Sequence, residues 1–143
     1  MQLINYTEEE KCAIAIQIAE TSLESITLKD KNYDFCKESI ELCRQWQQHK
    51  NISEVDILER ATSHGRAIAD IVMETKEDEL ANQYGSILIC VLYIAWQAYN
   101  YAENYYYPQE LETMDDKELE VLIDEMLEEG ELCVEDLEKW LLH

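Results

Sequence analysis

The longest apolar run in the chain reads Ile87-Leu88-Ile89-Cys90-Val91-Leu92-Tyr93-Ile94-Ala95-Trp96 and covers ten residues. A membrane-spanning helix needs roughly eighteen such residues, so the run is too short to span a membrane. Its β-branched residues leave a strand over 86–94 as an alternative, but the apolar pattern continues through Ala98 and Ala102, which favours a helix. A helix that is apolar on all sides is buried. We therefore expect a long helix over about 75–104 at the centre of a helical bundle.

Helical spacing on both sides of this run predicts further helices. Thr7 and Glu10 form a capping box at the start of the first one, and Ser53 and Asp115 are further start signals. Pro108, after the tyrosines at 105–107, is expected to end the central helix. The other predicted helices cover about 7–26, 33–50, 53–62, 68–72 and 115–129, followed by a last short helix with Leu137, Trp140 and Leu141. Ser63-His64-Gly65 is expected to interrupt the helical pattern between the helices at 53–62 and 68–72.

Glycine and proline are scarce, with three Gly and one Pro in 143 residues. Sheet proteins usually use more of both residues in their turns. The apolar share of 47% is ordinary for a globular protein and sufficient for a hydrophobic core. These features predict an all-α fold in which residues 1–143 form one domain, a bundle of about six or seven helices.

The chain is strongly acidic, with 32 acidic and 11 basic residues and a formal net charge of −21. Nucleic acids and anionic membranes bind proteins through Lys and Arg, so neither is an expected partner. A basic protein would be attracted and its association accelerated. The alternative is that the charge serves only solubility.

The negative charge is concentrated near the C-terminus, where residues 109–143 contain 14 acidic and two basic residues. Glu120, Asp124 and Glu128 are four residues apart and would form one row on a helix. Like charges at this spacing destabilise a helix slightly, which suggests a partner-binding face, although a solvated face is the alternative. Tyr105, Tyr106 and Tyr107 would supply aromatic contacts beside it. The full predicted partner surface is Tyr105, Tyr106, Tyr107, Asp115, Asp116, Glu118, Glu120, Asp124, Glu125, Glu128 and Glu131.

No motif for catalysis, cofactor binding or metal binding is found in the sequence. HExxH, a phosphate-binding Gly-rich loop and the EF-hand spacing are all absent. We therefore expect no enzyme activity, no cofactor and no metal, while a Cys paired with a distant His, such as Cys43 with His64, stays open as an alternative. The five Cys form no CxxC pair and the N-terminus has no secretory leader, which predicts a cytoplasmic protein with reduced thiols.

Two stretches resemble the sixth immunity-protein family of bacterial polymorphic toxin systems. They are Cys36-Lys37-Glu38-Ser39-Ile40-Glu41-Leu42-Cys43-Arg44-Gln45-Trp46 and Tyr93-Ile94-Ala95-Trp96-Gln97-Ala98-Tyr99, followed by Pro108. The likeness extends over roughly residues 10–130. The aromatic residues Trp46, Trp96 and Tyr99 are expected to be packing anchors, and the resemblance brings no set of toxin-contacting residues.

The resemblance implies that the protein binds and neutralises a cognate toxin by contacting its C-terminal catalytic domain, as in contact-dependent inhibition. Many such toxins are nucleases with basic substrate sites, which suits an inhibitor of charge −21. The alternative function is that of an acidic helical adaptor or a nucleic-acid mimic in another pathway.

Overall fold

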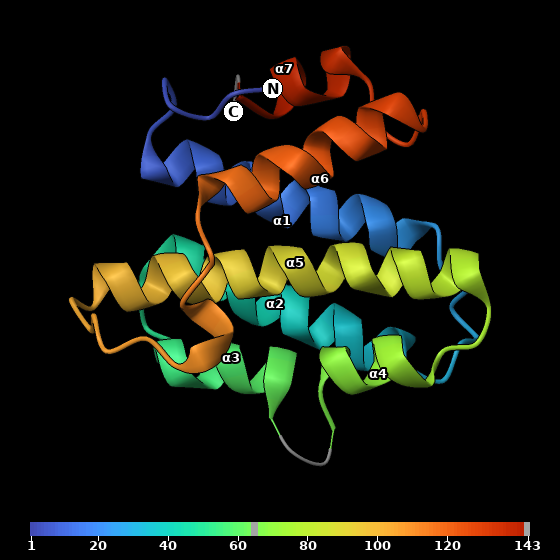
Figure 1. Ribbon diagram of the computed structural model, residues 1–143, viewed down its shortest axis with the longest axis horizontal. Coiled ribbons are helices and arrows are strands. Elements are labelled where there is room, and N and C mark those ends of the chain that lie inside the picture. The colour runs from blue at the N-terminus through green and yellow to red at the C-terminus, as the bar shows by residue number, and fades with distance from the viewer. Residues whose placement is uncertain (64–65, 142–143) are drawn as a thin grey trace.

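The long helix α5, Asp78–Tyr101, lies at the centre of the molecule, and α1, α2, α3, α4 and α6 all pack against it in the computed structural model (Figure 1). The structure describes residues 1–63 and 66–141. Burial extends around most of the helix circumference, since Ile87, Tyr93, Ala95 and Tyr99, which point in different directions around the helix axis, are almost fully inaccessible. This confirms the predicted central helix and excludes the strand over 86–94.

The helix α1, Glu8–Glu24, is the main neighbour of α5 and begins at the predicted capping box. The Thr7 hydroxyl accepts from the Glu10 amide at 3.1 Å, and the Glu10 carboxylate accepts from the Thr7 amide at 2.9 Å. The loop 27–32 then leads to α2, Tyr33–His49. Tyr84 of α5 is fully buried and donates its hydroxyl proton to Asp30 in this loop, which ties the loop to the central helix.

Two shorter helices, α3 (Glu54–Thr62) and α4 (Ile68–Glu74), cover another side of α5. The Ser53 hydroxyl caps α3 by accepting from the Val55 amide at 3.2 Å, as its position in the sequence predicts. The helix ends at Thr62, but His64 and Gly65 of the predicted interruption lie outside the described residues.

The end of α5 differs from the prediction. The helix stops at Tyr101, several residues before Pro108, so the prediction that Pro108 terminates it is wrong. Glu103 adopts a left-handed conformation with φ of 57°, and the Asn104 amide donates to the Tyr99 carbonyl at 2.9 Å. This is a Schellman closure formed without glycine. The chain therefore leaves the helix early, and residues 105–107 belong to the loop that follows it.

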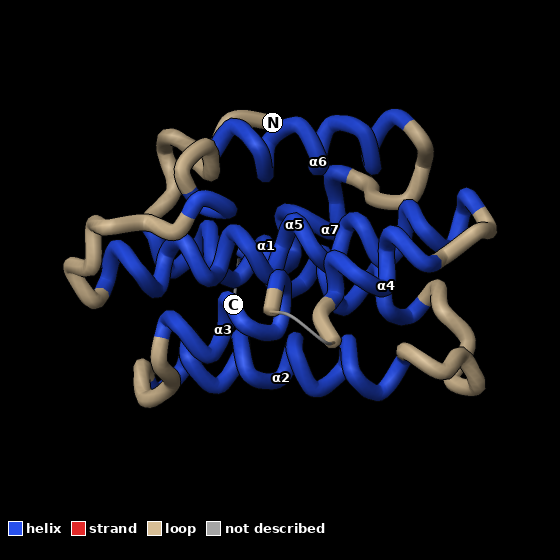
Figure 2. The backbone as a smooth tube through the Cα atoms, turned by 60° about the horizontal axis from the view of Figure 1, so that its bottom comes forward, coloured by secondary structure: helices blue, strands red, loops and turns tan. Residues whose placement is uncertain are grey.

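The remaining elements are the 3-10 turn η1 (Gln109–Leu111), α6 (Asp116–Glu128) and α7 (Val134–Leu141). Figure 2 shows only helices and loops in the described parts of the chain, which confirms the all-α prediction with seven α-helices there. Within residues 1–63 and 66–141, no helix combines the length and the apolar character that crossing a membrane requires.

Candidate functional site

The helix α6 carries most of the predicted partner residues and is built to expose them. The Asp115 carboxylate caps it by accepting from the amides of Lys117 and Glu118 at 3.0 and 3.3 Å. Gly130, with φ of 78°, closes the other end as predicted. Its buried stripe consists of Leu119, Leu122, Ile123 and Met126, so the acidic residues occupy the remaining circumference.

One row of these carboxylates is engaged by the protein itself. Asp116 accepts from the Lys11 ammonium at 2.8 Å, and Glu120 accepts from the Leu3 amide at 2.7 Å. Asp124, one turn further along, accepts from the amino group of Met1. Three of the predicted partner residues therefore hold the N-terminal segment and α1 against α6.

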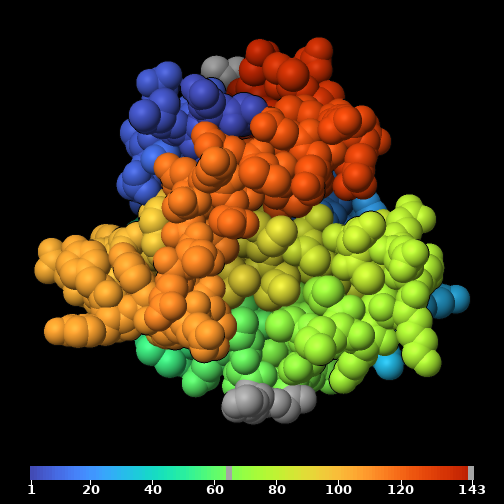
Figure 3. All heavy atoms as spheres, viewed as in Figure 1, coloured from blue at the N-terminus to red at the C-terminus, as the bar shows by residue number. Residues whose placement is uncertain are grey.

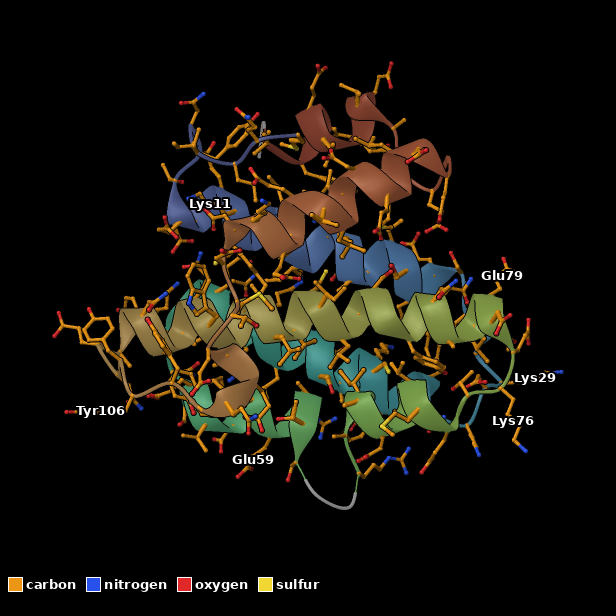
Figure 4. The ribbon with its side chains drawn as sticks, in the orientation of Figure 1. Lys11, Lys29, Glu59, Lys76, Glu79 and Tyr106 are labelled. Atoms are coloured by element: carbon orange, nitrogen blue, oxygen red, sulfur yellow. The ribbon has the colours of Figure 1, made fainter. Side chains whose placement is uncertain are left out.

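The buried Lys11 side chain, labelled in Figure 4, is the centre of a polar network that joins α1, α5 and α6. The Lys11 side chain is 9% exposed and also contacts the Glu8 carboxylate at 3.2 Å. On the other side, the Tyr93 hydroxyl donates to Asp116 at 2.7 Å and accepts from the Gln97 amide at 3.0 Å. Burial alone would lower the pKa of Lys11, but its hydrogen bonds to Asp116 and Glu8 outweigh this effect and raise the pKa above its ordinary value.

Sequence reasoning missed this network. The only signals were polar residues, Lys11 and Gln97, within segments that otherwise have a core pattern.

The other α6 carboxylates, Glu118, Glu125 and Glu128, are exposed, and Glu125 borders a groove of about 320 Å³ between α4, α5 and α6. The groove has apolar walls from Ile89, Leu122 and Met126, with Glu125, Glu129 and Glu131 beside them. Figure 3 shows atoms of α5 exposed between α6 and the helices α3 and α4. No salt bridge within the described residues involves Glu118, Glu125, Glu128, Glu129 or Glu131, which leaves their charge available to a partner.

Glu131 has a raised pKa. Partial burial is the main cause, followed by a hydrogen bond with the Glu129 carboxylate and the negative charge of that group. Two carboxylates held together resist losing both protons. A cation placed beside this pair would relieve the repulsion.

The three predicted tyrosines lie elsewhere. Residues 105–107 lie beyond the C-terminal end of α5. In both Figure 1 and Figure 2 this loop lies away from α6. Tyr106 is 95% exposed and points away from the protein in Figure 4, and Tyr105 is also exposed. Tyr107 is half-buried and donates to the Asn100 side chain. The predicted partner residues that are exposed and not engaged by the N-terminal segment or α1 therefore lie in two places, on the acidic side of α6 and at Tyr105 and Tyr106.

Four of the five cysteines, Cys12, Cys36, Cys43 and Cys90, are buried. Burial raises the pKa of the thiols of Cys12, Cys36 and Cys43 to about 12, so they stay protonated near neutral pH. His64, the considered partner of Cys43, lies outside the described residues. In the described parts of the chain, no group of three or more His, Cys, Asp or Glu side chains is arranged to hold a metal ion.

Comparison with known proteins gives one family. Residues 10–129 match the family model described as Immunity protein Imm6. No curated protein and no solved structure gives a significant match. Because the family match covers 120 of the 143 residues, the chain belongs to the Imm6 family of immunity proteins, a class whose partner is a toxin.

Proposed function

We propose that this immunity protein neutralises its toxin by binding a basic surface of the toxin's catalytic domain with the α6 acidic face. We define this face as the exposed residues Glu118, Glu125, Glu128, Glu129 and Glu131 together with the groove that Glu125, Glu129 and Glu131 border. The observation that carries the proposal is that these carboxylates are exposed and lack ion-pair partners among the described residues, and that Glu125, Glu129 and Glu131 lie beside apolar walls.

The two parts of this face have different roles in binding. Exposed carboxylates increase the association rate of a basic partner more than they increase the final affinity. Affinity comes mainly from desolvated apolar contacts, which Ile89, Leu122 and Met126 can supply once a partner side chain enters the groove. Val121, an exposed apolar residue on α6, extends that contact area.

A nuclease is the toxin class that this chemistry favours. Nucleases bind a polyanion through Lys and Arg, and an acidic face competes for the same side chains. Inhibition then requires only stoichiometric occupation of the substrate site, without catalysis, metal or cofactor on the immunity protein. We place this binding in the cytoplasm of the toxin-producing cell, with residues 1–143 acting as one domain and the exposed Tyr105 and Tyr106 as a second contact region.

Co-expression with the toxin domain encoded next to this protein tests the proposal, with cell survival and co-purification as readouts. The test variant is Glu125→Lys with Glu128→Lys. The matched control is Glu24→Lys with Glu41→Lys, which makes the same change in net charge at exposed positions on α1 and α2. The first variant should lose protection or require higher expression, while the control should protect. Equal protection by both variants would place the interface elsewhere, and absence of protection by the unmodified chain would refute the proposed pairing.

A further inference from the structure

A second concave site lies apart from the α6 acidic face. It is a pocket of about 420 Å³ between the first turn of α1, the end of α2 and the last turns of α5. Trp46, Trp96 and Tyr101 contribute aromatic surface to it, and Glu8 and Glu9 contribute carboxylates. None of the residues predicted from the sequence to bind a partner lines this pocket. Its combination of aromatic faces and negative charge is the chemistry that binds organic cations.

The protein's own Lys50 shows what this pocket accepts. Its ammonium nitrogen lies 4.5 Å from the ring centroid of Trp46 and 5.6 Å from that of Tyr101. It also lies 3.0 Å from a Glu9 carboxylate oxygen and 2.6 Å from the Gln47 carbonyl. The site therefore binds a primary ammonium by cation–π contact, ion pairing and hydrogen bonding together. The volume of about 420 Å³ remains open beside this lysine.

The backbone at Lys50 gives an independent indication. The residue caps α2 in the left-handed conformation, with φ of 53° and ψ of 29°. Glycine and asparagine adopt this conformation at less cost than lysine does. The lysine is thus not the residue that best closes the helix, and its side chain, 19% exposed, is directed into the pocket.

We propose that this pocket receives an arginine side chain of the partner, whose guanidinium stacks on Trp96 and Trp46, pairs with Glu8 and Glu9 and displaces the Lys50 ammonium. A guanidinium suits the site because it is planar, weakly hydrated and able to stack and pair at once. Displacing Lys50 would leave Glu9 without its cation, and Glu8, which also contacts Lys11 at 3.2 Å and accepts from the Gln97 amide at 2.7 Å, lies beside it in the same pocket. The identification of the partner as a toxin rests on the proposed function, but the arginine specificity of the pocket does not.

The test uses the full chain, labelled with ¹⁵N, and N-acetyl-arginine amide as the probe, followed through the indole N–H signals of the three tryptophans. N-acetyl-citrulline amide has the same shape without the charge and is the matched control. Trp46 and Trp96 should shift on saturable binding with a dissociation constant on the order of 1 mM, typical of so small a ligand. Trp140 in α7 does not line the pocket and should not shift. Equal shifts with the citrulline probe, or no shift at Trp96, would overturn the proposal.

Lys50→Asn provides the sharper test. Asparagine suits the left-handed backbone, so the variant keeps the fold while removing the resident cation. Because the probe must compete with Lys50 for the Trp46 ring and the Glu9 carboxylate in the wild-type pocket, this variant should bind the arginine probe roughly three to ten times more tightly. Adding Glu9→Gln in the Lys50→Asn background should weaken binding several-fold. An unchanged or weaker affinity of Lys50→Asn would refute the competition on which the inference depends.

The same variant separates this inference from the proposed function. Lys50→Asn should also dissociate more slowly from the toxin domain. Failure of the unmodified chain to bind any neighbouring toxin would refute the proposed function. It would not affect the arginine specificity of the pocket, which the probe titration tests separately. Conversely, if the protein binds the toxin tightly but the Trp46 and Trp96 signals do not shift with the arginine probe, only the proposed arginine pocket would be refuted.

Discussion

Replacing Asp116 by Asn should measurably destabilise the fold, because Asp116 is the best partner of a buried ammonium. Removing one member of a fully buried pair costs roughly 3–5 kcal/mol. Here the Asp116 side chain is 31% exposed, and Glu8, 68% exposed, stays near Lys11 at 3.2 Å, so the loss should be smaller. We expect the free energy of unfolding to fall by about 2 kcal/mol, which lowers Tm by about 4–8 °C for a chain of this size.

A double-mutant cycle with Lys11→Met isolates the ion pair. The variant with both changes has no buried charge left without a partner, so it should be more stable than the sum of the two single losses predicts, by about 1 kcal/mol or more. Urea unfolding followed by circular dichroism provides the free energies. Glu118→Gln is the matched control, since it removes another carboxylate from the first turn of α6 that is exposed and has no ion-pair partner among the described residues. The control should change stability by less than about 0.5 kcal/mol. Additive single losses, or an Asp116→Asn loss no larger than the control's, would refute the assigned role of the network.

Three further predictions concern stability and titration. The pKa values of Tyr84 and Tyr93 are raised, by burial first and then by hydrogen bonds to Asp30 and Asp116, so the folded state keeps protons that the unfolded state releases above its ordinary tyrosine pKa of 10.0. These two groups should therefore make stability fall as the pH rises through 10, beyond the fall that begins near pH 9 because the buried thiols of Cys12, Cys36 and Cys43 also keep protons that the unfolded chain releases. Tyrosinate absorbance should show Tyr84 and Tyr93 titrating only on unfolding. Gly130→Ala should lower the free energy of unfolding by about 1 kcal/mol because φ there is 78°. An unchanged urea midpoint would contradict the left-handed closure of α6 at Gly130. Ile87→Ala should cost about 2–5 kcal/mol because the side chain is fully buried against the surrounding helices, and a loss under 1 kcal/mol would argue against the central position of α5.

Much of the fold could be predicted because its signals are local. The ten-residue apolar run, the capping box at Thr7 and Glu10 and the side-chain cap at Asp115 are each contained within a few residues, and each determines a helix or one of its ends. The predicted end of α5 at Pro108 was wrong because the helix is closed at Glu103. This residue adopts the left-handed conformation, which is usually found at glycine, so nothing in the sequence indicated it.

The candidate surfaces depend on long-range contacts that spacing does not reveal. The spacing predicted a row of Glu120, Asp124 and Glu128, but Glu120 and Asp124, together with Asp116 one turn before them, accept from partners more than 100 residues away in the sequence. The pocket around Lys50 could not be predicted for the same reason, because its walls come from three helices that are distant in the sequence. Charge composition predicted an acidic face, and only the fold distinguishes the carboxylates that hold the protein together from those that are free to meet a partner.

The association rate of the purified protein with its toxin domain, measured across ionic strengths, tests the central claim most directly. Because the α6 acidic face is exposed, its charges should steer the encounter, and the rate should fall steeply as salt is added. Glu125→Lys with Glu128→Lys should lower the rate at low salt by about tenfold or more and flatten the salt dependence, while Glu24→Lys with Glu41→Lys should change both much less. A rate that does not depend on salt, or that responds equally to the two variants, would contradict toxin binding through this face.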